Sequence, residues 1–186
     1  SNNKKINKKA SNPISNFSKI SFLNSIKKAI NYIRLGDVLQ VVLSQRWKIE
    51  FKKHPFSFYR ALRKTNPSPY MFYFNFEGFQ IVGASPEILV KVSKNKVTIR
   101  PIAGTRPRGR NLKEDRYYET ELLKDPKENA EHLMLLDLGR NDVSKVSEIG
   151  TVKTTESFIV EKYSHVMHIV SNVEGELNSK YNNVDA

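Results

Sequence analysis

Glu128 and Glu131 are the two carboxylates whose spacing most directly suggests chemistry. They stand three positions apart in the stretch PKENAEH, and in a helix this spacing places both side chains on one face, where their charges repel. Mg²⁺ prefers oxygen ligands and is usually held by one or two carboxylates together with substrate and water. The pair therefore predicts half of a magnesium site, although glutamates at this spacing are also typical of a solvated helix face.

A second candidate site is the stretch PIAGTRPRGR, which follows a β-branched, strand-like run. Gly104 allows a ligand to approach the backbone closely, and the Thr105 hydroxyl can hydrogen-bond an anionic group. Three arginines follow: Arg106, Arg108 and Arg110. They either serve the ligand or balance the acidic helix that comes next.

Two histidines and one further glutamate complete the candidates. His168 lies in an alternating, strand-like stretch, and His165 stands three positions earlier, which would place the two rings on opposite faces of a sheet. One of them is expected to point toward a cleft and the other toward solvent or the core. Glu87 follows a Ser-Pro turn and either presents its carboxyl group to a pocket or is an exposed acid in a turn.

Several classes of protein are disfavoured by what the sequence lacks. It contains no cysteine, which excludes disulfides, thiolate zinc sites and cysteine nucleophiles. It has no Walker or dinucleotide-binding loop and no nucleophile-elbow motif. No apolar run approaches the roughly eighteen residues that a membrane helix requires, and the first ten residues resemble no signal peptide. The expected location is the cytoplasm.

The formal net charge of +12 over 186 residues raises the alternative of a basic module that binds nucleic acid. Lysines are scattered along the chain, however, and only the first nine residues form a dense basic run. No motif of interleaved aromatic and basic residues accompanies them. We therefore expect no nucleic-acid partner and no membrane partner.

The elements that would position these residues begin after a polar lead-in. Residues 1 to 18 are rich in Asn, Ser and Lys, which predicts a linker or disordered segment, and residues 19 to 186 read as one domain. Apolar residues at helical spacing predict an amphipathic helix from position 22 to position 33, capped by Ser21 and ended by Gly36.

The remaining segments alternate between strand and helix patterns. Strands are predicted at 37–51, 70–76, 79–85, 87–92, 96–102 and within 151–177. Helices are predicted at 56–64, 114–123 and 126–139, the last with Asp125 as its N-cap and Gly139 as its stop. Hairpins combined with separate helices indicate an α+β fold, with antiparallel sheets packed against helices.

Three long motifs, taken in order, resemble the chorismate-binding enzyme family: PIAGTRPRG, DPKENAEHLMLLDLGRND and YSHVMHIVSNVEGEL. Shorter stretches agree with the resemblance: GDVLQVVLSQRW, NPSPYMF and GASPEIL. The likeness covers nearly everything after residue 18 and is greatest to the members that form anthranilate. It implies the antiparallel sandwich of that family, truncated here to the N-terminal part of its catalytic domain.

The resemblance implies a reaction that begins tryptophan biosynthesis. Chorismate reacts with ammonia, delivered from glutamine by a partner amidotransferase subunit, to give anthranilate and pyruvate. The cofactor implied is Mg²⁺, and the full-length form is expected to be a hetero-oligomer. Because such enzymes are larger than this chain, we expect the 186 residues alone to hold half an active site and to show no turnover.

The resemblance also implies roles for individual residues. Glu87 matches the general acid that assists loss of the ring hydroxyl. Glu128 and Glu131 match the metal site, with Glu131 the surer ligand, and His168 rather than His165 matches the histidine beside the ring. The substrate pocket matches four consecutive residues: Ile102, Ala103, Gly104 and Thr105.

Two positions discriminate among relatives by their chemistry. Family members that add water use a lysine base where this chain has Gln40, and neutral ammonia needs no such base. Members that make aminodeoxychorismate carry an attacking lysine where this chain has Ala103. Both positions favour anthranilate, while aminodeoxychorismate and isochorismate synthases remain the alternatives.

Residues 66 to 72, NPSPYMF, resemble part of the family's allosteric tryptophan pocket. Pro69, Tyr70 and Met71 are the matched contacts, which implies feedback inhibition by tryptophan in the full-length protein. The alternative is a turn that leads into a buried aromatic strand, and both interpretations are compatible.

Overall fold

The structure is a computed structural model that describes residues 11–186. The chain divides into two compact units, Ser1–His54 and Pro55–Ala186, and most of the predicted lead-in lies outside the described residues. In the first unit, α1 (Lys19–Leu35) confirms the predicted helix. Its N-cap is Ser18 rather than Ser21, because the Ser18 hydroxyl accepts the Ser21 N–H at 3.1 Å.

The predicted strand at 37–51 is mostly wrong. Within the described part of the first unit, the strands are β1 (Ile14–Ser15) and β2 (Trp47–Lys48), which pair antiparallel over two residues each. β-branched residues favour an extended conformation, but a strand also needs a neighbour for its backbone N–H and C=O groups. β1 supplies such a neighbour for only two residues of the segment.

The second unit opens with a helix and a hairpin. α2 (Pro55–Thr65) ends just before Asn66 and Pro67, as predicted, and packs on the hairpin of β3 (Tyr70–Phe76) and β4 (Phe79–Ser85). Gly78, at φ +85°, provides the left-handed turn residue. The aromatic side chains of this hairpin are not buried as expected, since several are about half exposed: Phe74, Phe76 and Phe79.

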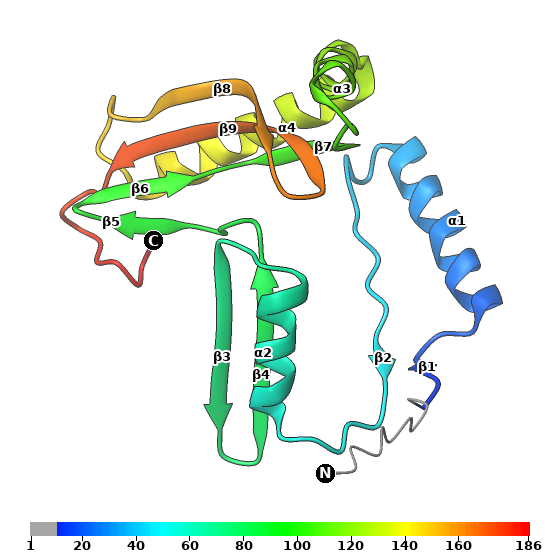
Figure 1. Cartoon of the computed structure of the whole chain (residues 1–186). Coiled ribbons are helices and arrows are strands. Elements are labelled where there is room, and N and C mark those ends of the chain that lie inside the picture. Colours follow the sequence, from blue (N-terminus) through cyan, green and yellow to red (C-terminus); the bar gives the residue numbers. More distant parts are fainter. Residues whose placement is uncertain (1–10) are drawn as a thin grey trace. The chain divides into compact units, whose positions relative to one another are not determined.

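A five-stranded antiparallel sheet forms the centre of the second unit (Figure 1). Its members are β5 (Lys91–Ser93), β6 (Lys96–Ile99), β7 (Ile102–Pro107), β8 (Lys153–Lys162) and β9 (Val166–Glu176). Val170 of β9 pairs with both Ile102 and Ile159, so β7 and β8 flank β9 on opposite edges. β6 continues the β7 edge, because it pairs with the C-terminal half of β9.

Two helices cover one face of this sheet. α3 (Leu112–Lys124) is capped by Asn111, and α4 (Pro126–Val146) is capped by Asp125 with Pro126 in its first turn, as predicted. The prediction that Gly139 stops the helix is wrong, because α4 continues for seven residues beyond it. A Cβ at Gly139 would lie 3.4 Å from Ile99 Cγ2, so this glycine instead lets α4 lie close to the sheet (Figure 1).

The core lies between these helices and the sheet. Buried side chains form one group beneath α4 and a second beneath α3: Val97, Leu136, Val143, Val173 and Leu177, then Leu122, Met167 and Ile169. Met167, Ile169 and Val173 project from the helix-facing side of β9, which is apolar except at Ser171, whose hydroxyl lies 2.7 Å from His132 Nε2 of α4. This arrangement confirms the predicted α+β fold of antiparallel sheets packed against helices.

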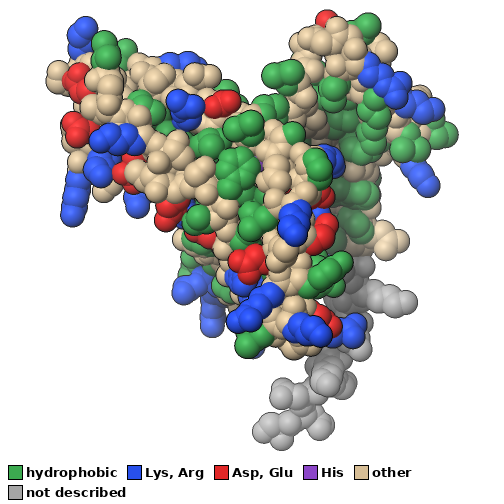
Figure 2. All heavy atoms as spheres, turned by 90° about the horizontal axis from the view of Figure 1, so that it is seen from above, with side chains coloured by type: hydrophobic (Ala, Val, Ile, Leu, Met, Phe, Trp, Pro, Cys, Tyr) green, Lys and Arg blue, Asp and Glu red, His purple; other side chains and the backbone are tan. Residues whose placement is uncertain are grey.

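On the face drawn in Figure 2, positive charge is dispersed rather than gathered into one patch. Figure 2 shows lysines and arginines spread over the visible face, separated by acidic and apolar side chains. Among the described residues, no helix combines the length and apolar character that crossing a membrane requires.

Candidate active site

His168 is fixed by two contacts from the irregular part of β7 that carries Gly104 and Thr105. Its Nδ1 atom lies 2.8 Å from the Gly104 carbonyl oxygen and 3.1 Å from the Thr105 hydroxyl. A carbonyl oxygen only accepts hydrogen bonds, so Nδ1 must carry the proton that it donates. In the neutral ring, Nε2 is then the unprotonated nitrogen and is the one able to exchange a proton.

The Gly104 carbonyl reaches His168 because β7 is irregular at this point. The register between β7 and β9 shifts between Ala103 and Arg106, and Gly104 adopts φ +67°. A Cβ at position 104 would lie 2.8 Å from Leu122 Cδ1, and Leu122 is fully buried. Glycine is therefore required both by the left-handed backbone and by the close approach of α3.

Glu87 lies close to the start of β7 and to His168. The Ser85 hydroxyl accepts the Glu87 N–H at 3.2 Å and donates to the Glu87 carbonyl at 2.8 Å, which holds the segment after β4 in a tight turn. Burial of the carboxyl group raises the pKa of Glu87, while a hydrogen bond from the Ile102 backbone and the charge of His168 act in the opposite direction. The structure thus brings Glu87, Ile102 and His168 into one neighbourhood.

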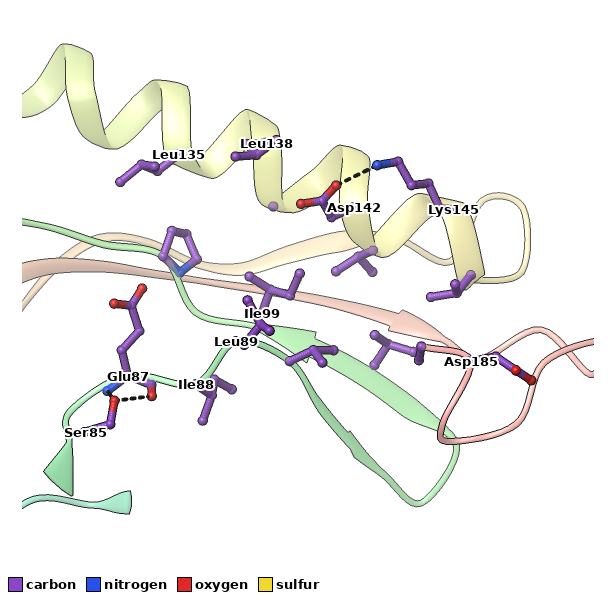
Figure 3. Close-up of a pocket in the computed structure, with 17 residues that line it drawn as sticks. Ser85, Glu87, Ile88, Leu89, Ile99, Leu135, Leu138, Asp142, Lys145 and Asp185 are labelled. Atoms are coloured by element: carbon purple, nitrogen blue, oxygen red, sulfur yellow. Dashed lines mark hydrogen bonds and ion pairs between the residues drawn. The ribbon is translucent and has the colours of Figure 1, made fainter. Parts of the chain in front are cut away.

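A cavity of about 790 Å³ adjoins Glu87. Figure 3 shows Glu87 on the segment after β4, with Leu135 and Leu138 of α4 on the opposite wall. Glu131 precedes Leu135 by four positions on α4, so both project from the same helix face. The lining of this cavity includes Glu87 but not Glu131 or His168.

Glu128 and Glu131 both lie in the first two turns of α4. Glu128 is partly buried, and its Oε2 atom would lie 3.4 Å from a Cβ at Gly104, so its carboxylate lies beside this part of β7. Among residues 11–186, no group of three or more His, Asp or Glu side chains is placed to hold a metal ion. Two carboxylates nevertheless suit Mg²⁺, which takes its remaining ligands from substrate and water.

The arginines after Thr105 pair with acidic residues of the helices that follow. Arg106 binds Glu121 and Asp125, and Arg108 binds Asp115 while donating to the Tyr163 carbonyl at 2.8 Å. The Arg108 guanidinium lowers the pKa of Asp115 to about 2. Of the two interpretations of these arginines, charge balance with the acidic helix therefore holds for Arg106 and Arg108.

A tyrosine that sequence reasoning missed lies against His168. The rings of Tyr163 and His168 meet edge to face with their centres 5.6 Å apart. The Tyr163 hydroxyl donates to Glu161 at 2.7 Å, and Glu161 is paired with Arg100 at 2.6 Å. Burial and the Glu161 carboxylate raise the pKa of Tyr163 to about 12. The cross-strand pairing of Glu161 with His168 could not be read from residue spacing.

His165 does not occupy the strand position expected of it. It lies in the turn between β8 and β9, is exposed, and its carbonyl accepts the Arg108 N–H at 3.1 Å. The alternation argument that placed it opposite His168 fails because β9 begins only at Val166.

The other predicted positions lie elsewhere in the chain. Gln40 belongs to the first unit, in the extended segment between α1 and β2. Pro69 precedes β3, and Tyr70 and Met71 are its first residues, paired with Ser85 and Ala84. Their roles stay predictions, as do those of the pocket residues Ile102 and Ala103.

Comparison with known proteins decides the family. The profile of a family described as chorismate binding enzyme matches residues 2–186. The chain belongs to this family. It is 64% identical over 163 residues to anthranilate synthase component 1 of Cereibacter sphaeroides, covering 88% of this chain and 33% of that protein. Its identity to the Pseudomonas aeruginosa component 1 is 56% over 170 residues, covering 91% of this chain and 35% of the relative.

A solved structure agrees with these matches. The crystal structure of anthranilate synthase component I from Streptococcus pneumoniae superposes with a TM-score of 0.85 at 42% identity, covering 94% of this chain and 38% of that one. The chain thus spans about a third of the length of the curated relatives it matches.

Proposed function

We propose that this chain carries part of the active site of an anthranilate synthase component I, which converts chorismate and ammonia to anthranilate and pyruvate. The observation that carries the proposal is identity of 64% and 56%, over most of the chain, to proteins of that name. The proposal includes a cytoplasmic location, a glutamine amidotransferase subunit as the source of ammonia, and inhibition by tryptophan at a site that includes Pro69, Tyr70 and Met71.

In this proposal Glu87 is the general acid. Hydroxide is a poor leaving group, so loss of the ring hydroxyl of chorismate requires a proton donor. The raised pKa of Glu87 supports the role, because a carboxyl group with a raised pKa keeps its proton to a higher pH. The turn made by Ser85 holds this group in place.

His168 handles a proton at Nε2. Its Nδ1–H is engaged by Gly104, which leaves Nε2 of the neutral ring to accept a proton from the substrate; only the protonated imidazolium can then donate from Nε2 to a substrate carboxylate. The proposal assigns the substrate pocket beside it to Ile102, Ala103, Gly104 and Thr105, with the Thr105 hydroxyl as a hydrogen-bond partner of the substrate.

Glu128 and Glu131 would hold Mg²⁺, Glu131 as the more direct ligand. When bound, the ion neutralises a carboxylate of the substrate and polarises the ring. The contribution of this chain is two oxygen donors on a single rigid helix, with one of them beside Gly104.

The choice of nucleophile follows from two side chains. Ala103 offers no amine that could attack the ring, and Gln40 offers no strong base for activating water. Ammonia, already a nucleophile, needs neither group. These positions support anthranilate over aminodeoxychorismate and isochorismate.

The test is product identification with the full-length protein. Chorismate, ammonium and Mg²⁺ are expected to yield anthranilate, detected by mass and fluorescence, and Glu87→Gln and His168→Gln are expected to lower the rate by about 10²-fold or more. Aminodeoxychorismate or isochorismate as the main product would refute the proposal. So would salt-sensitive DNA binding without turnover, since that is the behaviour of a basic binding module.

A further inference from the structure

The side chain of Arg106 connects three elements around the predicted metal site. It donates to both carboxylate oxygens of Glu121 on α3, and to Asp125 Oδ2 at 2.8 Å. It also donates to the carbonyl of Thr105, its own neighbour on β7, at 3.0 Å. Only 18% of the Arg106 side chain is exposed, whereas 41% of the Glu121 side chain is exposed, so water is excluded more from the guanidinium than from this partner.

Asp125 extends this connection to the backbone of Glu128. It is the N-cap of α4, and its Oδ1 atom accepts the N–H groups of Lys127 at 2.9 Å and Glu128 at 3.2 Å. Its other oxygen is the one that binds Arg106. One carboxylate therefore joins the guanidinium to the first turn of the helix on which Glu128 stands.

Arg106 also faces the Glu128 carboxylate directly. Its Nη1 atom lies 3.7 Å from Glu128 Oε1, and the Glu128 side chain is likewise 18% exposed. The guanidinium makes its shorter hydrogen bonds with Glu121 and Asp125. A single positive charge among three carboxylates leaves an excess of negative charge, which favours the binding of a divalent cation at Glu128.

We propose that Arg106 is a positioning residue for the predicted metal-binding glutamates: it sets the distance between Gly104 and Thr105 of β7 and the Glu128 carboxylate. The inference rests on the proposed function, in taking a divalent cation as the ion bound there. A planar guanidinium with five N–H donors can bind Glu121 through two parallel bonds and still reach Asp125 and Thr105. A lysine ammonium at the same position cannot span these partners.

The test compares Arg106→Lys with Arg108→Lys in the full-length enzyme. Arg108 stands two residues later and also pairs with a buried aspartate, Asp115, but no contact joins it to Glu128 among the bonds and ion pairs described. Mn²⁺ serves as the probe, with its dissociation constant measured by electron paramagnetic resonance without chorismate. Arg106→Lys is expected to weaken Mn²⁺ binding roughly 10- to 100-fold, as is typical when a group that orients a ligand is lost. Arg108→Lys is expected to change it less than about twofold.

A second variant covers the case in which Arg106→Lys does not fold. Asp125→Ser keeps an N-cap hydroxyl for α4 but removes the carboxylate that binds Arg106, and it is expected to weaken Mn²⁺ binding several-fold. If the folded variants bind Mn²⁺ like the wild type, the inference about Arg106 is wrong while the proposed function stands. The same holds if Arg108→Lys weakens Mn²⁺ binding as much as Arg106→Lys does. If the wild-type enzyme binds no Mn²⁺, both the inference about Arg106 and the metal part of the proposed function are wrong. If the enzyme makes a product other than anthranilate, the proposed function is wrong, but the comparison of Mn²⁺ binding remains valid.

Discussion

The Nδ1 atom of His168 lies 2.8 Å from the carbonyl oxygen of Gly104, so a backbone group selects the tautomer of a predicted catalytic ring. The left-handed conformation of Gly104, at φ +67°, directs this carbonyl. The chemistry assigned to His168 therefore depends on a residue that has no side chain.

Gly104→Ala is expected to destabilise the protein and to lower activity. Strain at the positive φ costs roughly 1–3 kcal/mol, and the new methyl group would meet buried Leu122 at 2.8 Å. Gly150→Ala is the matched control, because Gly150 has φ +82° with nothing within 4 Å of its Cβ position. Urea unfolding and kcat measurements should show a larger loss for Gly104→Ala, and equal losses would contradict the packing argument.

Tyr163→Phe and Tyr163→Leu should separate hydrogen bonding from ring packing. Phenylalanine keeps the edge-to-face contact with His168 and loses the bond to Glu161, a change worth about 1 kcal/mol. Leucine loses both. We expect kcat for anthranilate formation to fall several-fold in Tyr163→Phe and further in Tyr163→Leu. A Leu variant as active as the Phe variant would show that the ring contact does not orient His168.

His132 should make the fold sensitive to mild acid. Its ring is fully buried, Nε2 lies 2.7 Å from the Ser171 hydroxyl, and Nδ1 is without a hydrogen-bond partner in the described structure. Burial lowers the pKa of His132, so the unfolded state binds the proton more readily than the folded state. Above about pH 6.5, the ordinary pKa of histidine, His132 does not affect the free energy of unfolding. Below this pH, the protein becomes less stable as the pH decreases.

The measurement is urea unfolding between pH 5 and pH 8. His132→Gln should flatten the loss of stability below pH 6.5, whatever its effect at pH 8. His165→Gln, in the exposed turn between β8 and β9, should leave the pH dependence unchanged. An unaltered profile in His132→Gln would assign the acid sensitivity to other groups.

Asp115 should stabilise the fold at neutral pH and lose this effect only in strong acid. The pKa of its carboxyl group falls from 3.8 to about 2 beside Arg108 and the Gly109 N–H, so its contribution is complete above pH 3.8 and disappears as the pH approaches 2. Asp115→Asn should lower Tm at pH 7 and match the wild type near pH 2. Asp137→Asn, which removes an exposed pair with Arg140, should change Tm little. A similar Tm for both variants at pH 7 would refute this prediction.

Local sequence signals predicted the regular elements well where they concerned a single segment. Asp125 and Pro126 begin α4 as expected, because capping depends on neighbouring residues alone. The prediction that Gly139 ends the helix was wrong because this residue packs near Ile99, which lies forty positions away in the sequence. Likewise, the β-rich composition of residues 37–51 does not indicate that β2 pairs with β1 over only two residues.

The sequence pointed to several residues that lie together in the candidate site, but not to the contacts between them. The family resemblance singled out His168, Gly104 and Thr105, and the structure brings these three together. Tyr163 was not predictable, and the sequence left two roles open for Arg106 and Arg108, since these contacts depend on an irregular register between β7 and β9 and on the packing of α3. Contacts between residues far apart in the chain produce no periodic pattern in the sequence.

The β3–β4 hairpin has a practical consequence for work with these 186 residues. Phe74, Phe76 and Phe79 are about half exposed, and in the described structure neither outer edge of the hairpin is hydrogen-bonded to a further strand. Exposed aromatic residues beside open strand edges promote association between copies. Purification should therefore favour low protein concentration and mild detergent, and light scattering before any assay would tell monomer from aggregate.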